Sequence, residues 1–156
     1  MTLVREATPA DREWIGNLLR ERWHGTQIAA HGELIDALEL PALVADDRCG
    51  LATWRWVGGD AELMTLDAVP TGCGTGTALI EALVARLRAQ GCARLCLTTT
   101  NDNLPALRFY MRRGFRLIAL RPGAVDEARK QKPSISLLGK HGIPIHDELE
   151  LCLALN

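Results

Sequence analysis

Apolar and polar residues alternate along the chain in two different periods, and these periods predict its elements. A period of two predicts strands, and a period near 3.6 predicts amphipathic helices. Strand patterns occupy residues 2–7, 42–45, 50–57, 61–68, 94–99, 115–120 and 148–153. Helical patterns begin near Thr8 and Thr77 and at Asn103, and they end near Trp23, Gln90 and Arg113.

Local signals support the predicted helix ends. Thr8 is suited to an N-cap, Pro9 to the first helical position and Asp11 to the first turn. Gly91 and Gly114 follow the second and third helices, where glycine commonly terminates a helix. Residues 24–40 fit neither period clearly. Residues 121–147 are rich in proline and glycine and predict an irregular segment with at most one short helix, near 124–131.

The order of these elements predicts a mixed α/β fold. An antiparallel meander, with a tight turn at Gly58-Gly59-Asp60, leads into a β-α-β unit, and helices cover both faces of the sheet. The strand at 94–99 is expected to run parallel to the strand at 61–68, because a helical crossover joins them.

Composition narrows the class of protein. The chain has 156 residues, 47% of them hydrophobic, which predicts one domain spanning 1–156 with a core of its own. The net charge of −1 argues against a nucleic-acid partner. Apolar runs are too short to span a membrane, and no signal-peptide pattern is present. The five cysteines are an odd number without a Cys-x-x-Cys pair, so we expect no metal site, mostly buried thiols and a cytoplasmic location.

A glycine-rich loop joins the strand at 61–68 to the next helix. Gly72, Gly74 and Gly76 alternate with other residues there. Glycine allows close backbone approach, and the first N–H groups of a helix attract anions, so the loop predicts a phosphate or pyrophosphate site. Ordinary turn chemistry is the competing explanation. No lysine follows Gly76, and the third glycine comes too early for a dinucleotide-binding fingerprint, which excludes two common nucleotide loops.

Two motifs resemble those of the GNAT superfamily of N-acetyltransferases. Residues 69–80, Val-Pro-Thr-Gly-Cys-Gly-Thr-Gly-Thr-Ala-Leu-Ile, resemble its motif A. Residues 103–115, Asn-Leu-Pro-Ala-Leu-Arg-Phe-Tyr-Met-Arg-Arg-Gly-Phe, look like its motif B. The similarity covers roughly residues 2–120 and extends into the last strand.

The resemblance implies that acetyl-coenzyme A (acetyl-CoA) is the co-substrate and that the acetyl group passes directly to an amine in a ternary complex. It implies a pyrophosphate-binding loop and a strand whose backbone near 66–69 holds the pantetheine arm and the thioester. The implied cofactor contacts are Leu66, Ala68, Val69, Thr71, Gly72, Cys73, Gly74, Thr75, Gly76, Thr77, Asn103 and Tyr110. The family usually has Arg or Gln where this chain has Thr71, so we expect weaker cofactor binding unless Arg112, Arg113 or another basic group compensates.

Acetyl transfer requires a proton donor for the thiolate and an acceptor for the amine proton. Tyr110, the only tyrosine, falls on the motif position that lies near the sulfur, although core packing is the competing role. Glu62 is the first choice of base. Strict alternation puts Glu62, Met64, Leu66 and Ala68 on one face and Leu63, Thr65 and Asp67 on the other. A bulge would reverse this parity, so Asp67 remains an alternative.

Other residues carry weaker signals. The four histidines occur singly and are expected to be surface or hydrogen-bonded residues rather than bases. Trp54 and Trp56 are expected in the core, with lining of the acceptor site as the minority alternative. Cys73 is not expected to act as a nucleophile, because no histidine neighbours it in sequence.

The sequence leaves the acceptor open between a small-molecule and a peptide amine. We expect segment 121–147 to help shape the acceptor site. A homodimer through the terminal strands is a further expectation, and a non-catalytic acyl-CoA-binding sensor is the alternative function.

Overall fold

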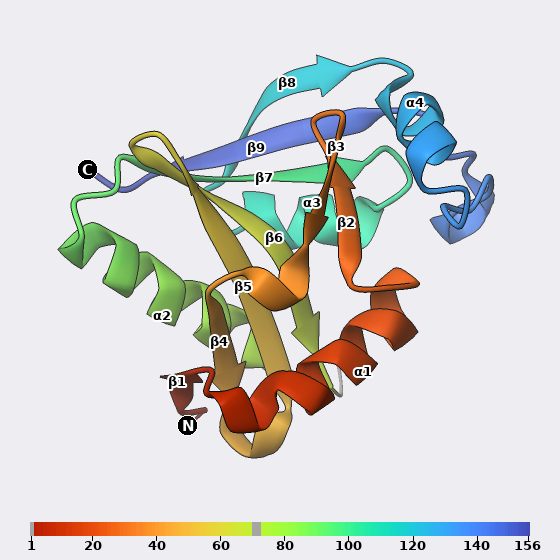
Figure 1. Ribbon diagram of the computed structural model, residues 1–156. Coiled ribbons are helices and arrows are strands. Elements are labelled where there is room, and N and C mark those ends of the chain that lie inside the picture. The colour runs from red at the N-terminus through yellow and green to blue at the C-terminus, as the bar shows by residue number, and fades with distance from the viewer. Residues whose placement is uncertain (1, 70–72) are drawn as a thin grey trace.

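A seven-stranded mixed sheet runs through the protein (Figure 1). The computed structural model describes residues 2–69 and 73–156. In spatial order the strands are β1 (Val4–Glu6), β4 (Ala42–Ala45), β5 (Gly50–Val57), β6 (Asp60–Ala68), β7 (Arg94–Thr100), β9 (Glu148–Ala154) and β8 (Arg116–Arg121).

The predicted chain order of the fold is confirmed. Strands β4, β5 and β6 form an antiparallel meander. Helix α2 (Thr75–Ala89) then crosses over to β7, which pairs with β6 in parallel. Strand β9 returns antiparallel between β7 and β8.

Helices pack on both faces of the sheet, each over its own hydrophobic cluster. Helix α1 (Arg12–Trp23) buries Ile15 and Leu19 against one face. Helix α2 buries Leu79 and Leu83 against the other face, where α3 (Leu104–Met111) adds Tyr110. A fully buried leucine stabilises the fold by about 2 kcal/mol, so these helical stripes fix which side of each helix faces the sheet.

The two segments that the sequence left undecided lie beside each other. Residues 24–40 contain a separate hairpin of β2 (Gln27–Ala30) and β3 (Glu33–Asp36). Within 121–147 the one α-helix is α4 (Ala124–Gln131), as expected. The Lys132 ammonium joins the two segments, because it donates to the backbone oxygens of Trp23 and Gln27 at 2.8 and 2.6 Å. Short 3₁₀ turns occupy Pro9–Asp11, Ala37–Glu39, Asp46–Arg48 and Lys140–Gly142.

The predicted parity of β6 is wrong beyond Met64. Thr65 pairs with Thr53, but Leu63 pairs with Trp54, so Met64 is an extra residue in β6. A β-bulge of this kind reverses the side-chain alternation. Met64 packs in the α1-side cluster, whereas Leu66 packs against the α2-side cluster. Glu62 and Asp67, five residues apart, therefore face the same side of the sheet.

The expectation of mostly buried thiols is also wrong. Cys96 and Cys152 occupy directly opposed positions on β7 and β9 and form a disulfide. Of the other three, Cys92 is buried, Cys49 is half-buried and Cys73 is exposed. The two bonded cysteines are 56 residues apart, and strand pairing alone brings them together.

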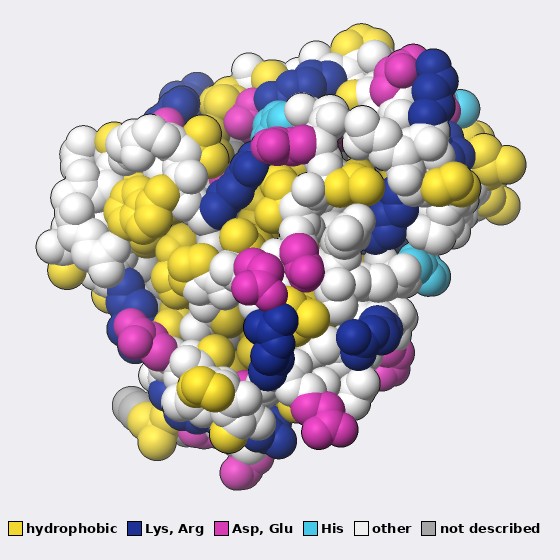
Figure 2. Space-filling view, viewed as in Figure 1, with side chains coloured by type: hydrophobic (Ala, Val, Ile, Leu, Met, Phe, Trp, Pro, Cys, Tyr) yellow, Lys and Arg dark blue, Asp and Glu magenta, His cyan; other side chains and the backbone are white. Residues whose placement is uncertain are grey.

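Among residues 2–69 and 73–156, no helix combines the length and apolar character needed to cross a membrane. Charged side chains of both signs are interspersed on the face shown in Figure 2.

Candidate active site

A cavity of about 650 Å³ opens where β6 and β7 part. The two strands pair from Ala61–Leu95 to Leu63–Leu97, although β6 continues to Ala68 and β7 to Thr100. The pairing ends at the bulge, since Met64 is the extra residue. The end of α1, the β2–β3 hairpin and segment 125–145 enclose the cavity, which also reaches Asn103 and Pro105 at the start of α3.

The backbone of β6 beyond the bulge faces this opening at alternate residues. The Val69 N–H donates to the Cys49 oxygen at 2.8 Å, toward β5, so it is not available to a ligand. Because backbone groups alternate in direction along a strand, the N–H and C=O groups of Leu66 and Ala68 point toward parted β7. Leu66 is among the residues that line the cavity, whereas Ala68 and Val69 are not.

The glycine loop meets the first turn of α2. Gly74 is the helix N-cap and has a φ of 79°, a conformation that favours glycine. Gly76 is explained by packing, because a Cβ there would approach Phe109 to 3.2 Å. Thr75 is buried near Cys49. Thr71 and Gly72 lie outside the described residues.

A basic groove of about 490 Å³ lies beside the start of α2. Arg113 donates from its Nε and Nη2 atoms to the Thr77 hydroxyl and from Nη1 to the Phe109 oxygen. Its guanidinium stacks 3.6 Å from the Phe109 ring centroid. Arg108 and Arg112 line the same groove. The groove therefore combines three arginines with the first turn of α2, whose N–H groups favour an anion.

Glu62 is buried and held by two neighbours. Its Oε1 accepts from Arg55 Nε at 2.8 Å, and its Oε2 lies 2.6 Å from His31 Nε2. Arg55 also binds Glu33 of β3, so these contacts fasten the hairpin to the sheet. Sequence reasoning did not select His31, because the hairpin that brings it to Glu62 has no clear pattern.

Asp67 is the second acidic residue of β6 in the cavity. Its carboxylate accepts from the Trp23 indole N–H at 2.9 Å. Burial raises the pKa of Asp67, while the indole hydrogen bond and the charge of Arg22 act in the opposite direction. Asp67 is therefore easier to protonate than an ordinary aspartate.

Glu148, at the start of β9, is a cavity residue that sequence reasoning missed. It is 7% exposed and lies opposite Thr100 of β7. Burial raises its pKa, His31 and Arg121 lower it, and Glu62 and Glu150 raise it. The alternating pattern of 148–153 identified the strand, but it did not indicate that the sheet brings Glu148 near Glu62.

Tyr110 is buried between Phe109 and Phe115, with ring centroids 5.1 and 5.3 Å away. It is not among the residues that line the cavity. Burial and then the charge of Asp67 raise its pKa, and Arg113 lowers it. The Tyr110 hydroxyl consequently keeps its proton at neutral pH. Although Tyr110 does not line the cavity, the charge of the cavity residue Asp67 acts on it.

Asn103 lines the cavity and also caps α3. Its Oδ1 accepts from the Ala106 N–H, and its Nδ2 donates to the Thr99 hydroxyl, both at 3.3 Å. The capping contacts give Asn103 a structural role, and a cofactor contact remains a prediction.

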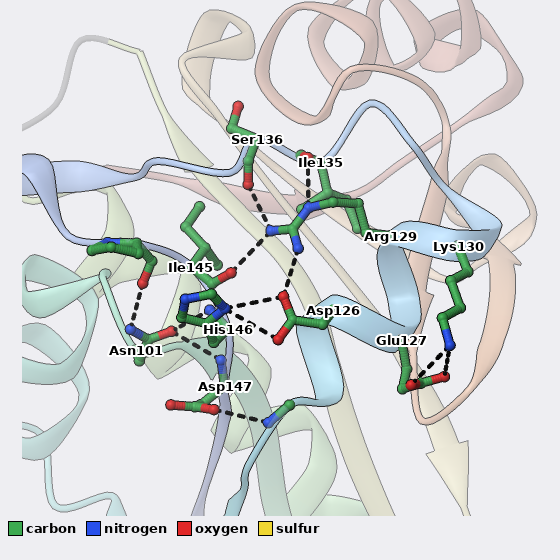
Figure 3. A network of polar contacts seen from close by, with 12 residues as sticks. Asn101, Asp126, Glu127, Arg129, Lys130, Ile135, Ser136, Ile145, His146 and Asp147 are labelled. Carbon is green, nitrogen blue, oxygen red and sulfur yellow. Dashed lines mark hydrogen bonds and ion pairs between the residues drawn. The ribbon is translucent and has the colours of Figure 1, made fainter.

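The irregular segment that follows β8 forms one wall of the cavity. Its lining residues are mostly apolar or small: Val125, Ala128, Lys132, Ser134, Ile135, Ser136, Leu138, Gly139, Lys140 and Ile145. Figure 3 shows the polar network that orders it around Arg129, which donates to three backbone oxygens and to Asp126. Asn101, just after β7, binds both His146 and Asp147 backbone N–H groups, at 2.9 and 3.0 Å.

The remaining sequence candidates lie elsewhere. Trp54 is buried in the core, and Trp56 is 44% exposed. Neither lines the cavity, whereas Trp23, which the sequence did not select, does. His146 is paired with Asp126.

Comparison with known proteins shows which family this chain belongs to. The model of the acetyltransferase (GNAT) family matches residues 49–115. The uncharacterised protein YxbD of Bacillus subtilis strain 168 is 36% identical over 144 residues, covering 90% of this chain and 91% of that protein. The chain belongs to the GNAT acetyltransferase family.

Solved structures agree on the fold. The ribosomal-protein-S18-alanine N-acetyltransferase of Escherichia coli has a TM-score of 0.69 at 16% identity, covering 100% of this chain and 95% of that one. A GNAT family acetyltransferase of Elizabethkingia anophelis, solved with acetyl-CoA bound, has a TM-score of 0.68 at 14% identity, covering 98% and 97%.

Proposed function

We propose that the protein is an N-acetyltransferase that transfers an acetyl group from acetyl-CoA directly to a primary amine, with both substrates bound together. The observation that carries this proposal is the parting of β6 and β7 at a bulge, beside a glycine-capped helix N-terminus. That geometry offers an extended ligand both backbone partners and an anion site.

The residues present fit acetyl-CoA. Leu66 and Ala68 would hold the pantetheine arm through their outward backbone groups, and Gly74 to Thr77 would hold the pyrophosphate through the first N–H groups of α2. The groove of Arg108, Arg112 and Arg113 supports the expectation that basic groups compensate for Thr71. Acetyl-CoA supplies an acetyl group activated as a thioester.

Two carboxylates are candidates for taking the amine proton. Because of the bulge, the side chains of Glu62 and Asp67 point to the same side of β6, and both residues line the cavity. Glu62 is our first choice, acting directly or through water, with His31 and Arg55 fixing its orientation. Asp67 is the alternative, because burial raises its pKa and so makes this carboxylate a better proton acceptor than an ordinary aspartate.

Tyr110 is the proposed proton source for the departing sulfur. Its raised pKa keeps the hydroxyl protonated, which suits a hydrogen-bond donor and excludes a role as base at neutral pH. Segment 121–147 is proposed to shape the acceptor site, because ten of its residues line the cavity. We also propose a homodimer through the terminal strands, and edge strand β8 beside β9 supports it by exposing Leu117, Ile118 and Leu120.

Release of free thiol from acetyl-CoA across a panel of amines tests the proposal. We expect turnover with at least one primary amine and a loss of about 100-fold in kcat in the variant that removes the base. Glu62→Gln and Asp67→Asn, assayed from pH 5 to 9, decide between the carboxylates, since the variant lacking the base loses the acid limb of the kcat/KM profile. Tight acetyl-CoA binding without transfer to any amine favours the sensor function instead.

A further inference from the structure

Glu148 stands apart from the other acidic side chains of the cavity, because no residue of the described chain binds its carboxylate. Glu62 is bound by Arg55 and His31, and Asp67 by Trp23. Asp102, the fourth acid of the lining, accepts from the Thr100 hydroxyl and the Lys140 N–H. Glu148 is equally buried, at 7% exposure, and lines the same cavity.

The charges around Glu148 leave one negative charge without a bonded partner. Four groups act on it: His31 from the hairpin, Arg121 from β8, Glu62 from β6 and Glu150 from its own strand. Arg121 lies opposite Glu148 in the pairing of β8 with β9, but its Nη2 is bound to Glu150 and its buried Nη1 has no hydrogen-bond partner among the described residues. Arg55 is bound to Glu62 and Glu33. A buried carboxylate is costly unless a cation or hydrogen-bond donor reaches it.

A second polar atom in the same cavity is also unsatisfied. The Thr98 hydroxyl oxygen is buried and has no hydrogen-bond partner among the described residues. Thr98 lies opposite Glu150 on the paired strand, and Glu148 lies opposite Thr100, so Thr98 and Glu148 are diagonal neighbours on one face. A carboxylate and a hydroxyl oxygen together can accept two N–H bonds from one ammonium group.

We infer that Glu148, with Thr98 beside it, is the subsite that receives the ammonium group of a cationic alkylamine acceptor. This inference rests on the proposed function and specifies its substrate class. The apolar wall of Val125, Ile135 and Ile145 suits the alkyl chain of such an amine. An amino acid is disfavoured, because its carboxylate would meet Glu148 and Glu62 in the same space.

The decisive variant is Glu148→Gln, which keeps the side-chain volume and removes the charge. With n-pentylamine, a cation at neutral pH, we expect KM to rise about 20-fold. With aniline, which is neutral, KM should change by less than about threefold, and the KM for acetyl-CoA should stay as in the wild type. Glu127→Gln is the control, because Glu127 is paired with Lys130, does not line the cavity and is not among the charges that act on Glu148.

An equilibrium measurement separates this inference from the proposed function. Calorimetry on the CoA-saturated wild-type protein should detect n-pentylamine binding and much weaker binding of n-pentanol, which has the same chain without the charge. This comparison needs no variant and no turnover. Equal binding of amine and alcohol, or an unchanged KM in a folded Glu148→Gln protein, overturns the subsite even if acetyl transfer occurs. Charge-selective binding without transfer to any amine supports the subsite and refutes the enzyme.

Discussion

Arg129 holds the cavity wall in place, and replacing it with methionine tests that role. The variant keeps the apolar stem of the side chain and removes the guanidinium. In the native protein that group donates to the backbone oxygens of Ile135, Ser136 and Ile145 at 3.1, 2.8 and 2.9 Å (Figure 3). The Arg129 side chain is 15% exposed, so water replaces these bonds only in part.

The magnitude follows from the three lost bonds to the backbone. At a net value of about 1 kcal/mol each, their removal lowers the free energy of opening segment 132–146 by about 3 kcal/mol. Opening should then become about 150-fold more frequent. Helix α2 and strands β4 to β6 make none of these contacts and should keep their stability.

Hydrogen exchange measures this opening directly. The Gly139 and Ile145 amides donate to Ile143 and Leu137 across the segment, both at 2.9 Å, and should exchange about 150-fold faster in Arg129→Met. The KM for the amine acceptor should rise, while the KM for acetyl-CoA stays constant. Lys130→Met is the control, because the Lys130 ammonium binds exposed Glu127 and no other residue of the described chain.

Exchange at Gly139 and Ile145 within about threefold of the wild type would refute the reasoning, because these bonds would then contribute little to holding the wall. Faster exchange with an unchanged acceptor KM would show that the wall is held by Arg129 but takes no part in acceptor binding.

Three further substitutions test other parts of the molecule. Gly74→Ala should lower the free energy of unfolding by about 1–2 kcal/mol and weaken CoA binding, because φ is 79° at this position. Denaturation and calorimetry measure the two effects, and Gly59→Ala, which lies in open space without that strain, should show neither. Tyr110→Phe should lower kcat about 100-fold with unchanged CoA affinity, and a kcat near the wild-type value would leave Tyr110 a packing residue. Arg5 holds the pKa of Asp11 below its usual range, so this carboxylate stabilises the fold fully above about pH 4 and loses its effect as the pH falls. Asp11→Asn should cost about 2 kcal/mol at pH 7 and less in acid, measured by urea unfolding at both pH values, and an equal loss in acid would contradict the assignment.

Periodicity and end signals determined most of the elements. The strand and helix positions, the parallel pairing of β6 with β7 and the short helix at 124–131 were all predictable, because each depends on residues close in sequence. Thr8, Pro9 and Asp11 likewise marked the start of the first helical segment. The motifs around Gly74 and Tyr110 indicated the family for the same reason.

Only the tertiary structure decided which acidic side chains meet. A single extra residue at Met64 puts Glu62 and Asp67 on one face, and no local pattern announces such a bulge, because its signal is the register against β5. Glu148 lies more than 80 residues from Glu62 in sequence and His31 about 30, yet both come near it in the fold. Cys96 meets Cys152 because β7 pairs with β9. The sequence by itself determined the order of the strands and helices and the glycine-rich segment that ends at the start of α2. The acidic lining of the cavity arises from long-range contacts, whose partners a local pattern does not specify.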